Sequence, residues 1–239
     1  MSSVFITGAN RGIGLGIVQQ FLKDPSFVHV FATTRNVSNS KELTSINDPR
    51  LHVVEMDVAN DDSIRSALTK AEAVLGNKGL DILVNNSGVL ESYPVDGPPD
   101  RAKLHRIYDI NAVGVLIITQ IFLPLLKKST HPKVVTVSSG CGSIGASLGS
   151  LAQADLYVIG YSMSKSAVNQ AMKTLAVDHF NDPIIFVSFC PGAVQTDMAN
   201  GRGLITVEES TSTLVDSIKK VTKINSGGYY HRDLQAIPY

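Results

Sequence analysis

The stretch that decides the fold is Val4-Phe5-Ile6-Thr7-Gly8-Ala9-Asn10-Arg11-Gly12-Ile13-Gly14. Its apolar residues predict a buried strand, and its glycines lead into a helix that we expect over Gly12–Lys23. Glycine allows a tight turn and a close approach of the backbone to a ligand, while the unpaired N–H groups at the start of a helix attract a pyrophosphate. The stretch therefore predicts a phosphate-binding turn, although the glycines alone also fit a turn without a ligand.

Outward from this turn, short runs rich in valine and isoleucine alternate with longer amphipathic stretches. The runs predict strands at Ser3–Thr7, Val28–Thr33, Leu51–Met56, Asp81–Asn85, Lys133–Ser138, Ile184–Phe189 and Gly228–Tyr230. The stretches predict helices at Gly12–Lys23, Asp61–Gly76, Asp100–Lys128, Asp155–Phe180 and Val207–Lys223. The alternation is typical of an α/β protein with a doubly wound parallel sheet, here of about seven strands with helices on both faces. Because no linker rich in proline, glycine or serine interrupts it, we expect a single domain over residues 1–239.

Composition and charge exclude several classes of protein. The chain balances 21 Lys and Arg against 21 Asp and Glu and lacks the long basic run of a nucleic-acid-binding protein. Its longest apolar stretch, Ala112–Leu126, is shorter than the about 20 residues of a membrane span and predicts a buried helix. Cys141 and Cys190 are too few for a disulfide framework, and the 6 histidines lack metal-site spacing. We expect a cytoplasmic protein that acts on a small molecule, without metal, membrane or nucleic acid.

Further motifs follow the glycine turn in a fixed order. They are Asp57 after the third expected strand, Asn85-Asn86-Ser87-Gly88 after the fourth, Asn111 in the long helix, Ser138-Ser139 after the fifth strand, Tyr161-x-x-x-Lys165, and Pro191-Gly192 after the sixth. Together with Gly8, Gly12 and Gly14 in the form T-G-x-x-x-G-x-G, this order resembles the short-chain dehydrogenase/reductase family. Within the family the chain looks most like the sniffer-type carbonyl reductases. The resemblance implies a Rossmann-type fold and an oxidoreductase.

Two positions depart from the family pattern. Ser87 stands where the family has alanine, and Ser139 and Tyr161 are 22 positions apart (161 minus 139), which is longer than usual. The intervening Gly140–Gly160 is rich in glycine, serine and alanine, so we expect an extended loop beside the active site. The long interval leaves open whether Ser138 or Ser139 contacts the carbonyl, and the second serine of the family motif corresponds to Ser139.

The end of the second expected strand bears on the choice of cofactor. The sequence there is Ala32-Thr33-Thr34-Arg35, without the acidic residue that would bind the ribose 2′-OH of NAD. Arg35 and Arg11 instead offer two guanidinium groups for the 2′-phosphate of NADP(H). The resemblance implies cofactor contacts from Gly8, Asn10, Arg11, Gly12, Ile13, Gly14, Arg35, Asp57, Val58, Asn85, Ser87, Gly88, Tyr161, Lys165, Pro191, Gly192, Val194 and Thr196.

Tyr161 and Lys165 are four positions apart, so on a helix they project from one face. A neighbouring ammonium stabilises a phenolate, and we therefore expect Lys165 to lower the pKa of Tyr161. The resemblance implies that Tyr161 protonates the carbonyl oxygen of the substrate and that Ser139 hydrogen-bonds this oxygen. It also implies that Lys165 holds the ribose hydroxyls and that Asn111 holds a water for a proton relay.

The function expected from these residues is the NADPH-dependent reduction of a small ketone, aldehyde or quinone. Two alternatives stay open: an NADP(H)-binding regulatory protein without significant catalysis, and an NAD-linked alcohol dehydrogenase. The apolar helices expected at Asp100–Lys128 and Asp155–Phe180 exceed what one domain needs to cover its sheet, and the family commonly pairs such helices. We therefore expect a homodimer.

Overall fold

The structure is a computed structural model that describes residues 1–146 and 157–239. Its centre is one seven-stranded sheet in the order β3-β2-β1-β4-β5-β6-β7, and every neighbouring pair is parallel. The strands are β1 (Ser2–Ile6), β2 (Phe27–Thr34), β3 (Leu51–Glu55), β4 (Ile82–Asn85), β5 (Lys133–Val137), β6 (Ile185–Cys190) and β7 (Tyr229–His231). The doubly wound α/β fold is thus confirmed. The strand order reverses between β1 and β4, where open sheets of this kind bind ligands.

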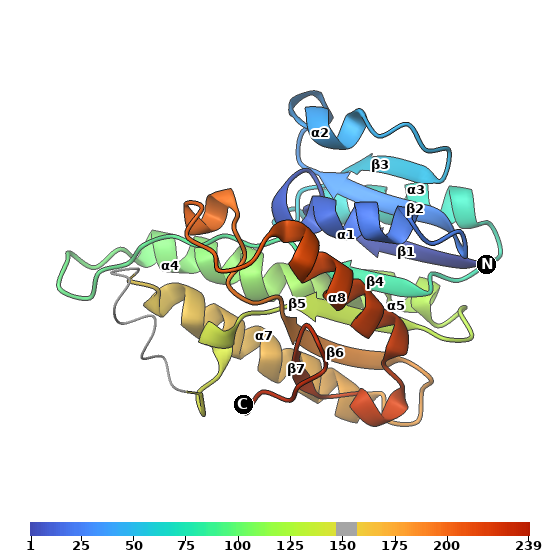
Figure 1. Cartoon of the computed structure of the whole chain (residues 1–239). Helices are drawn as coiled ribbons and strands as arrows, with labels where there is room; N and C mark the ends of the chain where they lie inside the picture. Colours follow the sequence, from blue (N-terminus) through green and yellow to red (C-terminus); the bar gives the residue numbers. More distant parts are fainter. Residues whose placement is uncertain (147–156) are drawn as a thin grey trace.

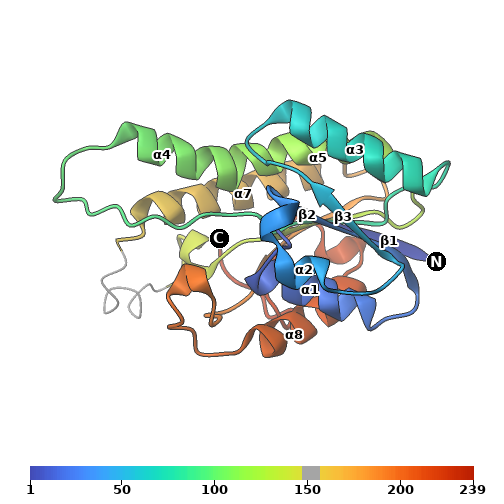
Figure 2. The ribbon, with the colours of Figure 1, turned by 90° about the horizontal axis from the view of Figure 1, so that it is seen from above.

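Helices cover both faces of the sheet (Figure 1). Seen from above, α1 and α8 lie on one side of the strands and α3, α4 and α5 on the other (Figure 2). Two buried apolar layers result, one containing side chains of α1 and α8 and the other containing side chains of α3, α5 and α7. The helices are α1 (Gly12–Leu22), α2 (Lys41–Thr44), α3 (Asp61–Leu75), α4 (Arg101–Tyr108), α5 (Gly114–Leu126), α7 (Ile159–Asp178) and α8 (Val207–Lys220). Burial on both faces explains why the strands lack strict alternation of apolar and polar residues.

Short 3₁₀ turns and a π-turn complete the described chain. The 3₁₀ turns are η1 (Val37–Asn39), η3 (Gly140–Gly142), η4 (Asp197–Ala199) and η5 (Lys223–Asn225), and η2 (Asp109–Val113) is the π-turn between α4 and α5.

Several helix starts follow local capping signals in the sequence, while two helices are exceptions to the predicted pattern. Thr206 and Glu209 form the capping box at the start of α8, and the Asp100 carboxylate accepts the Lys103 N–H at the start of α4. The first exception is the short α2, which the sequence pattern did not predict. The second is α7, which starts at Ile159 inside the expected loop Gly140–Gly160, while residues 147–156 of that loop lie outside the described part of the chain.

One continuous helix is long and apolar enough to cross a membrane by length and composition alone. It runs over Arg101–Leu126, through α4, η2 and α5, and its most apolar window has a mean hydropathy of 1.8 with 44% of the window buried. Its side chains Ile118, Phe122, Leu125 and Leu126 belong to the buried layer beneath the sheet. Packing in the core therefore accounts for much of its apolar character.

Phe122 of α5 tests the contribution of that buried layer to stability. Its side chain is fully buried, and its ring centroid lies 4.6 Å from that of Phe5 on β1. We expect Phe122→Ala to lower the free energy of unfolding by about 3–5 kcal/mol, because it removes buried contacts and leaves a cavity. Phe180→Ala is the matched control, since Phe180 is 73% exposed. Urea denaturation measures both; equal losses in the two variants would contradict this account of the core.

Candidate active site

The turn between β1 and α1 requires glycine either for its backbone conformation or for lack of space. Gly8 and Gly12 have φ of +63° and +54°, values that favour glycine. A Cβ at Gly14 would stand 2.2 Å from the Gly8 carbonyl oxygen. Within the described chain, the side chain of Arg11 at the N-cap makes no hydrogen bond to the start of α1. The first N–H groups of the helix therefore remain available to an anion.

A second turn, after β4, is tied to this one. The Thr7 hydroxyl accepts the N–H groups of Asn86 and Ser87, each at 3.0 Å. The Asn86 carboxamide donates to the carbonyl oxygens of Thr7 and Gly8, each at 3.0 Å. Asn86 is thus a structural part of the glycine turn. The sequence contained its signal, because Asn86 belongs to the Asn-Asn-Ser-Gly motif, but the expected cofactor contacts did not include it.

A cleft of about 400 Å³ opens at the carboxyl ends of the strands. The predicted residues that line it are Gly8, Asn10, Arg11, Gly12, Ile13, Gly14, Arg35, Asp57, Val58, Ser87, Gly88, Tyr161, Lys165, Pro191 and Thr196. These residues fit a dinucleotide, because the glycine turn and the open start of α1 suit a pyrophosphate, and the lining continues from Arg35 to Tyr161. Five predicted residues, Asn85, Asn111, Ser139, Gly192 and Val194, are not part of this lining.

Three of the predicted residues outside the lining, Asn85, Gly192 and Val194, have contacts elsewhere in the fold. Asn85 is 1% exposed, and its carboxamide donates to the Thr119 hydroxyl at 3.2 Å. Val194 is also buried and pairs with Ile205 in a short parallel bridge. Gly192 has φ of +90°, and a Cβ there would meet the Arg232 guanidinium at 2.9 Å. These three residues therefore shape the backbone next to the cleft.

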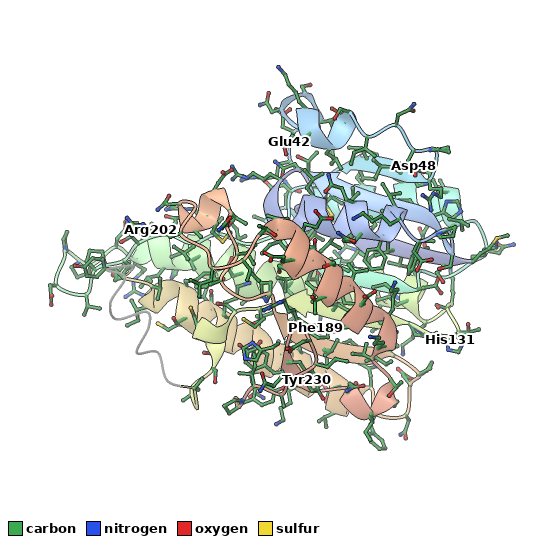
Figure 3. All side chains as sticks on the ribbon, viewed as in Figure 1. Glu42, Asp48, His131, Phe189, Arg202 and Tyr230 are labelled. Atoms are coloured by element: carbon green, nitrogen blue, oxygen red, sulfur yellow. The ribbon has the colours of Figure 1, made fainter. Side chains whose placement is uncertain are left out.

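Several lining residues were missed from the sequence. They include Thr34, Glu42, Val89, Ile110 and Gln195. Glu42, labelled in Figure 3, comes from the short α2, which no pattern predicted. Asp197 comes from η4 and lies 3.3 Å from the Arg11 guanidinium, with both side chains exposed. No local signal marks Glu42, since only the folded chain brings α2 to the cleft.

Tyr161 and Lys165 lie on one face of α7 at the inner end of the cleft. Both are buried, at 8% and 4% exposure, and the Lys165 Nζ lies 5.6 Å from the Tyr161 ring centroid. The ammonium donates a hydrogen bond to the Val137 carbonyl oxygen at 2.8 Å. This contact places Lys165 against the end of β5, next to the Ser138-Ser139 pair.

The electrostatics of this pair differ from the expectation. Burial raises the pKa of Tyr161 well above its ordinary value, and a hydrogen bond from the Ser139 side chain offsets only part of that effect. Burial also lowers the pKa of Lys165 to about 8. The net shift of the Tyr161 pKa is therefore upward, opposite to the predicted direction, because desolvation is its largest cause. Tyr161 is protonated at neutral pH.

The two candidate serines have different surroundings. The Ser138 hydroxyl is buried in the cleft wall and has no hydrogen-bond partner among the described residues. The Ser139 hydroxyl accepts the Cys141 N–H at 3.2 Å, and the Ser139 side chain acts to lower the pKa of Tyr161. Of the two serines, Ser139 is the one whose side chain affects the pKa of the buried tyrosine.

Asn111 lies in the π-turn η2, fully buried. Its carboxamide oxygen accepts the Val89 N–H at 2.8 Å, and its nitrogen donates to the Val89 carbonyl oxygen at 2.8 Å and to Ser164 at 3.0 Å. A Cβ at Gly88 would lie 3.3 Å from this oxygen and 3.7 Å from the Lys165 Nζ. Asn111 therefore anchors the segment after β4 close to Lys165, and its expected part in a proton relay stays a prediction.

Comparison with known proteins gives the family. A family model described as short chain dehydrogenase matches residues 2–204. An uncharacterized oxidoreductase of Schizosaccharomyces pombe is 33% identical, with 98% of this chain and 97% of that protein covered.

Two solved structures share the fold over the whole chain. The carbonyl reductase Sniffer of Drosophila melanogaster has a TM-score of 0.92 at 32% identity and covers 100% of both chains. The NADPH-bound carbonyl reductase from chicken fatty liver has a TM-score of 0.94 at 28% identity and covers 100% of this chain and 94% of that chain. With the glycine turn and the Tyr161–Lys165 pair at one cleft, this chain belongs to the short-chain dehydrogenase/reductase family and is an oxidoreductase that uses a nicotinamide cofactor.

Proposed function

We propose that the protein reduces a small carbonyl compound, a ketone, aldehyde or quinone, with NADPH. The observation that carries the proposal is the buried, protonated Tyr161 beside Lys165 and Ser139, at the inner end of a cleft that suits a dinucleotide. A tyrosine in this state is a proton donor, which is what the reduction of a carbonyl group requires. The likeness to carbonyl reductases of fly and chicken supports the same reaction class.

The preference for NADPH rests on charge at the cleft. Arg11 and Arg35 both line it and both are exposed, so their guanidinium groups are free to turn toward a 2′-phosphate. Arg11 would exchange its contact with Asp197 for this phosphate; an exposed ion pair of this kind contributes about 0–1 kcal/mol. Glu42, Asp57 and Asp197 also line the cleft and oppose an added negative charge. The preference for the phosphorylated cofactor therefore depends on direct contact of Arg11 and Arg35 with its phosphate.

Each side chain of the site has a separate role in the proposed reaction. NADPH, when bound, supplies the hydride. Tyr161 donates its hydroxyl proton to the carbonyl oxygen, and Ser139 donates a hydrogen bond to the same oxygen as negative charge develops on it. Lys165, held by the Val137 carbonyl oxygen, keeps a positive charge beside Tyr161 and favours its deprotonated form after the transfer. Asn111 orders the backbone around Lys165.

We also propose that the chain forms a homodimer through the α4–α5 and α7 helices. Ile159, Met163 and Val177 of α7 are 43%, 46% and 68% exposed, and Val113 of η2 is 49% exposed. These apolar side chains are available to a second copy of the chain. The oligomeric state and the cytoplasmic location stay predictions.

Tyr161→Phe is the first test of the reaction. We expect turnover of NADPH with a panel of quinones, α-dicarbonyls and aldehydes to fall by about 10²- to 10⁴-fold, because the proton donor is gone. NADPH binding, followed by fluorescence, should stay within about twofold, since the ring that lines the cleft remains. NADPH binding without turnover by the unaltered protein would contradict the proposal and favour a regulatory NADP(H)-binding protein.

Arg35→Asp tests the choice of cofactor. We expect the ratio of kcat/KM for NADPH to kcat/KM for NADH to fall by about 10- to 100-fold, because a charge-assisted hydrogen bond to phosphate is replaced by repulsion. Arg65→Asp is the matched control, since Arg65 is exposed on α3 and does not line the cleft. An unchanged ratio in Arg35→Asp would remove Arg35 as the residue that recognises the phosphate. Preference of the unaltered protein for NADH would favour an NAD-linked alcohol dehydrogenase.

The buried lysine predicts the pH dependence. Burial lowers the pKa of Lys165 to about 8, so the ammonium that the reaction uses exists below that pH and is lost above it. We expect kcat/KM for NADPH, which reports the free enzyme, to fall as pH rises through about 8, while Tyr161 stays protonated. Steady-state kinetics between pH 6 and about 10 measure this. A flat profile across this range would contradict the assigned role of the Lys165 charge.

A further inference from the structure

The backbone that carries Ser139 depends on parts of the chain far from it in sequence. The Ser138 N–H donates to the Phe189 carbonyl oxygen at 2.7 Å, and the Gly140 N–H donates to the Cys190 sulfur at 3.1 Å. On the other side, the Ser166 hydroxyl of α7 donates to the Gly142 carbonyl oxygen at 3.0 Å. Side chains and neighbouring strands therefore supply partners to this segment that regular secondary structure would otherwise provide.

Tyr229 of β7 makes the most direct of these contacts. Its hydroxyl donates to the carbonyl oxygen of Ser139 itself, which also accepts the Gly142 N–H at 2.8 Å. The Tyr229 side chain is 2% exposed and packs with Cys190 and Ile237 in a small buried cluster. The buried hydroxyl restricts the orientation of that peptide, because breaking the bond would leave the hydroxyl without this acceptor and the carbonyl oxygen with the Gly142 N–H as its remaining donor.

The C-terminal segment holds the next part of the same loop. The Ser143 hydroxyl donates to the Pro238 carbonyl oxygen, and the Gly145 N–H donates to the Tyr239 carbonyl oxygen at 2.9 Å. The Ile237 N–H donates to the Tyr229 carbonyl oxygen at 2.9 Å, so the segment is also joined to β7. Figures 1 and 2 both place the C-terminus beside the chain that follows β5.

The side chain of Tyr239 holds the C-terminal segment against α7 and the turn before β7. Its hydroxyl donates to the Gly227 carbonyl oxygen, and the Lys173 ammonium of α7 lies 4.3 Å from the centroid of its ring. Contacts thus run from α7 and β7 through residues 237–239 to the loop after Ser139.

We propose that Tyr229 is a positioning residue for Ser139 and that residues 237–239 complete the carbonyl site by holding the loop from Gly140 to Ala146. The inference rests on the proposed function, because it concerns the serine that would hydrogen-bond the carbonyl oxygen. Tyr229 and residues 237–239 touch neither cofactor nor substrate in this proposal. They act through the peptide of Ser139 and the backbone that follows it.

Tyr229→Phe separates positioning from general stability, because it removes one hydroxyl and keeps the buried ring. We expect kcat for the carbonyl panel to fall about 10-fold, since small misplacements of a group at the reacting centre have effects of this size. The Kd for NADPH should stay unchanged, because the Tyr229 side chain does not line the cleft.

Tyr230→Phe is the matched control. Tyr230 is the next residue on β7, its ring centroid lies 6.1 Å from that of Phe189 (Figure 3), and its hydroxyl accepts a hydrogen bond from Asn225 at 3.4 Å. It has no contact with the Ser139 loop among the contacts described, so kcat should stay within about twofold of the unaltered protein. Equal kcat values for the two tyrosine variants, with equal Tm, would overturn the assignment of Tyr229.

Two more variants test the C-terminal segment. Its acceptors are main-chain oxygens of Pro238 and Tyr239, so we end the chain at Ala236 to remove them. Ser143→Ala acts from the loop side: it removes the hydroxyl that donates to Pro238 and that also accepts the Ala146 N–H at 2.9 Å. We expect both to lower kcat and to leave the Kd for NADPH unchanged. If the shortened chain does not fold, Ser143→Ala decides, and unchanged kcat in that variant would overturn the role of residues 237–239.

Hydrogen exchange of the unaltered and Tyr229→Phe proteins separates this inference from the proposed function. We expect the amides of Cys141, Gly142 and Gly145 to exchange at least about 10-fold faster in the variant, whether or not any carbonyl compound is turned over. Faster exchange without turnover by the unaltered protein would reject the carbonyl reductase and keep the positioning contact. Unchanged exchange would reject the contact even if the enzyme is active.

Discussion

The rest of the site depends on the close approach of the Gly8 peptide to two other parts of the chain. Its carbonyl oxygen accepts a hydrogen bond from Asn86 and stands 2.2 Å from the place where a Cβ of Gly14 would be. This approach brings the turn after β1, the start of α1 and the turn after β4 into one unit at the point where the strand order reverses. A side chain at Gly14 would separate these parts, and the start of α1 would no longer face the cleft.

The parallel sheet explains why the side chains of the candidate active site lie together at the carboxyl ends of the strands. Both faces are covered by apolar layers, and polar side chains that would be costly inside those layers collect where the strands end. Tyr161 and Lys165 lie at the boundary between core and cleft. Their burial keeps the tyrosine protonated and holds the pKa of the lysine at about 8, so the same desolvation acts on both partners in opposite directions.

Placement of the serine has a different origin from placement of the tyrosine. Tyr161 is fixed by the regular geometry of α7, whereas Ser139 follows β5 in a segment without a continuous ladder of hydrogen bonds. That segment takes its partners from Cys190, from Tyr229 and from the main chain of Pro238 and Tyr239. The serine that would hydrogen-bond the carbonyl oxygen of the substrate is thus held by contacts with residues 229–239.

The sequence alone determined the fold class and most of the cleft. Strand and helix periods are local, so seven strands and the main helices could be placed within a few residues, and the family motifs identified the residues from Gly8 to Thr196 that line the cleft. The sequence also contained the capping box of Thr206 and Glu209, which depends only on residues three apart. Each of these features arises from neighbours in the chain.

Only the tertiary structure decided the pKa of Tyr161, the presence of Glu42 in the cleft, and the contact from Tyr229 to Ser139. The spacing of Tyr161 and Lys165 showed their proximity, but the direction of the pKa shift depends on how much water the whole fold removes from them. Tyr229 and Ser139 are 90 positions apart, and no local pattern joins them. Burial and long-range contact are properties of the assembled chain, because they depend on which distant segments displace solvent at a given atom.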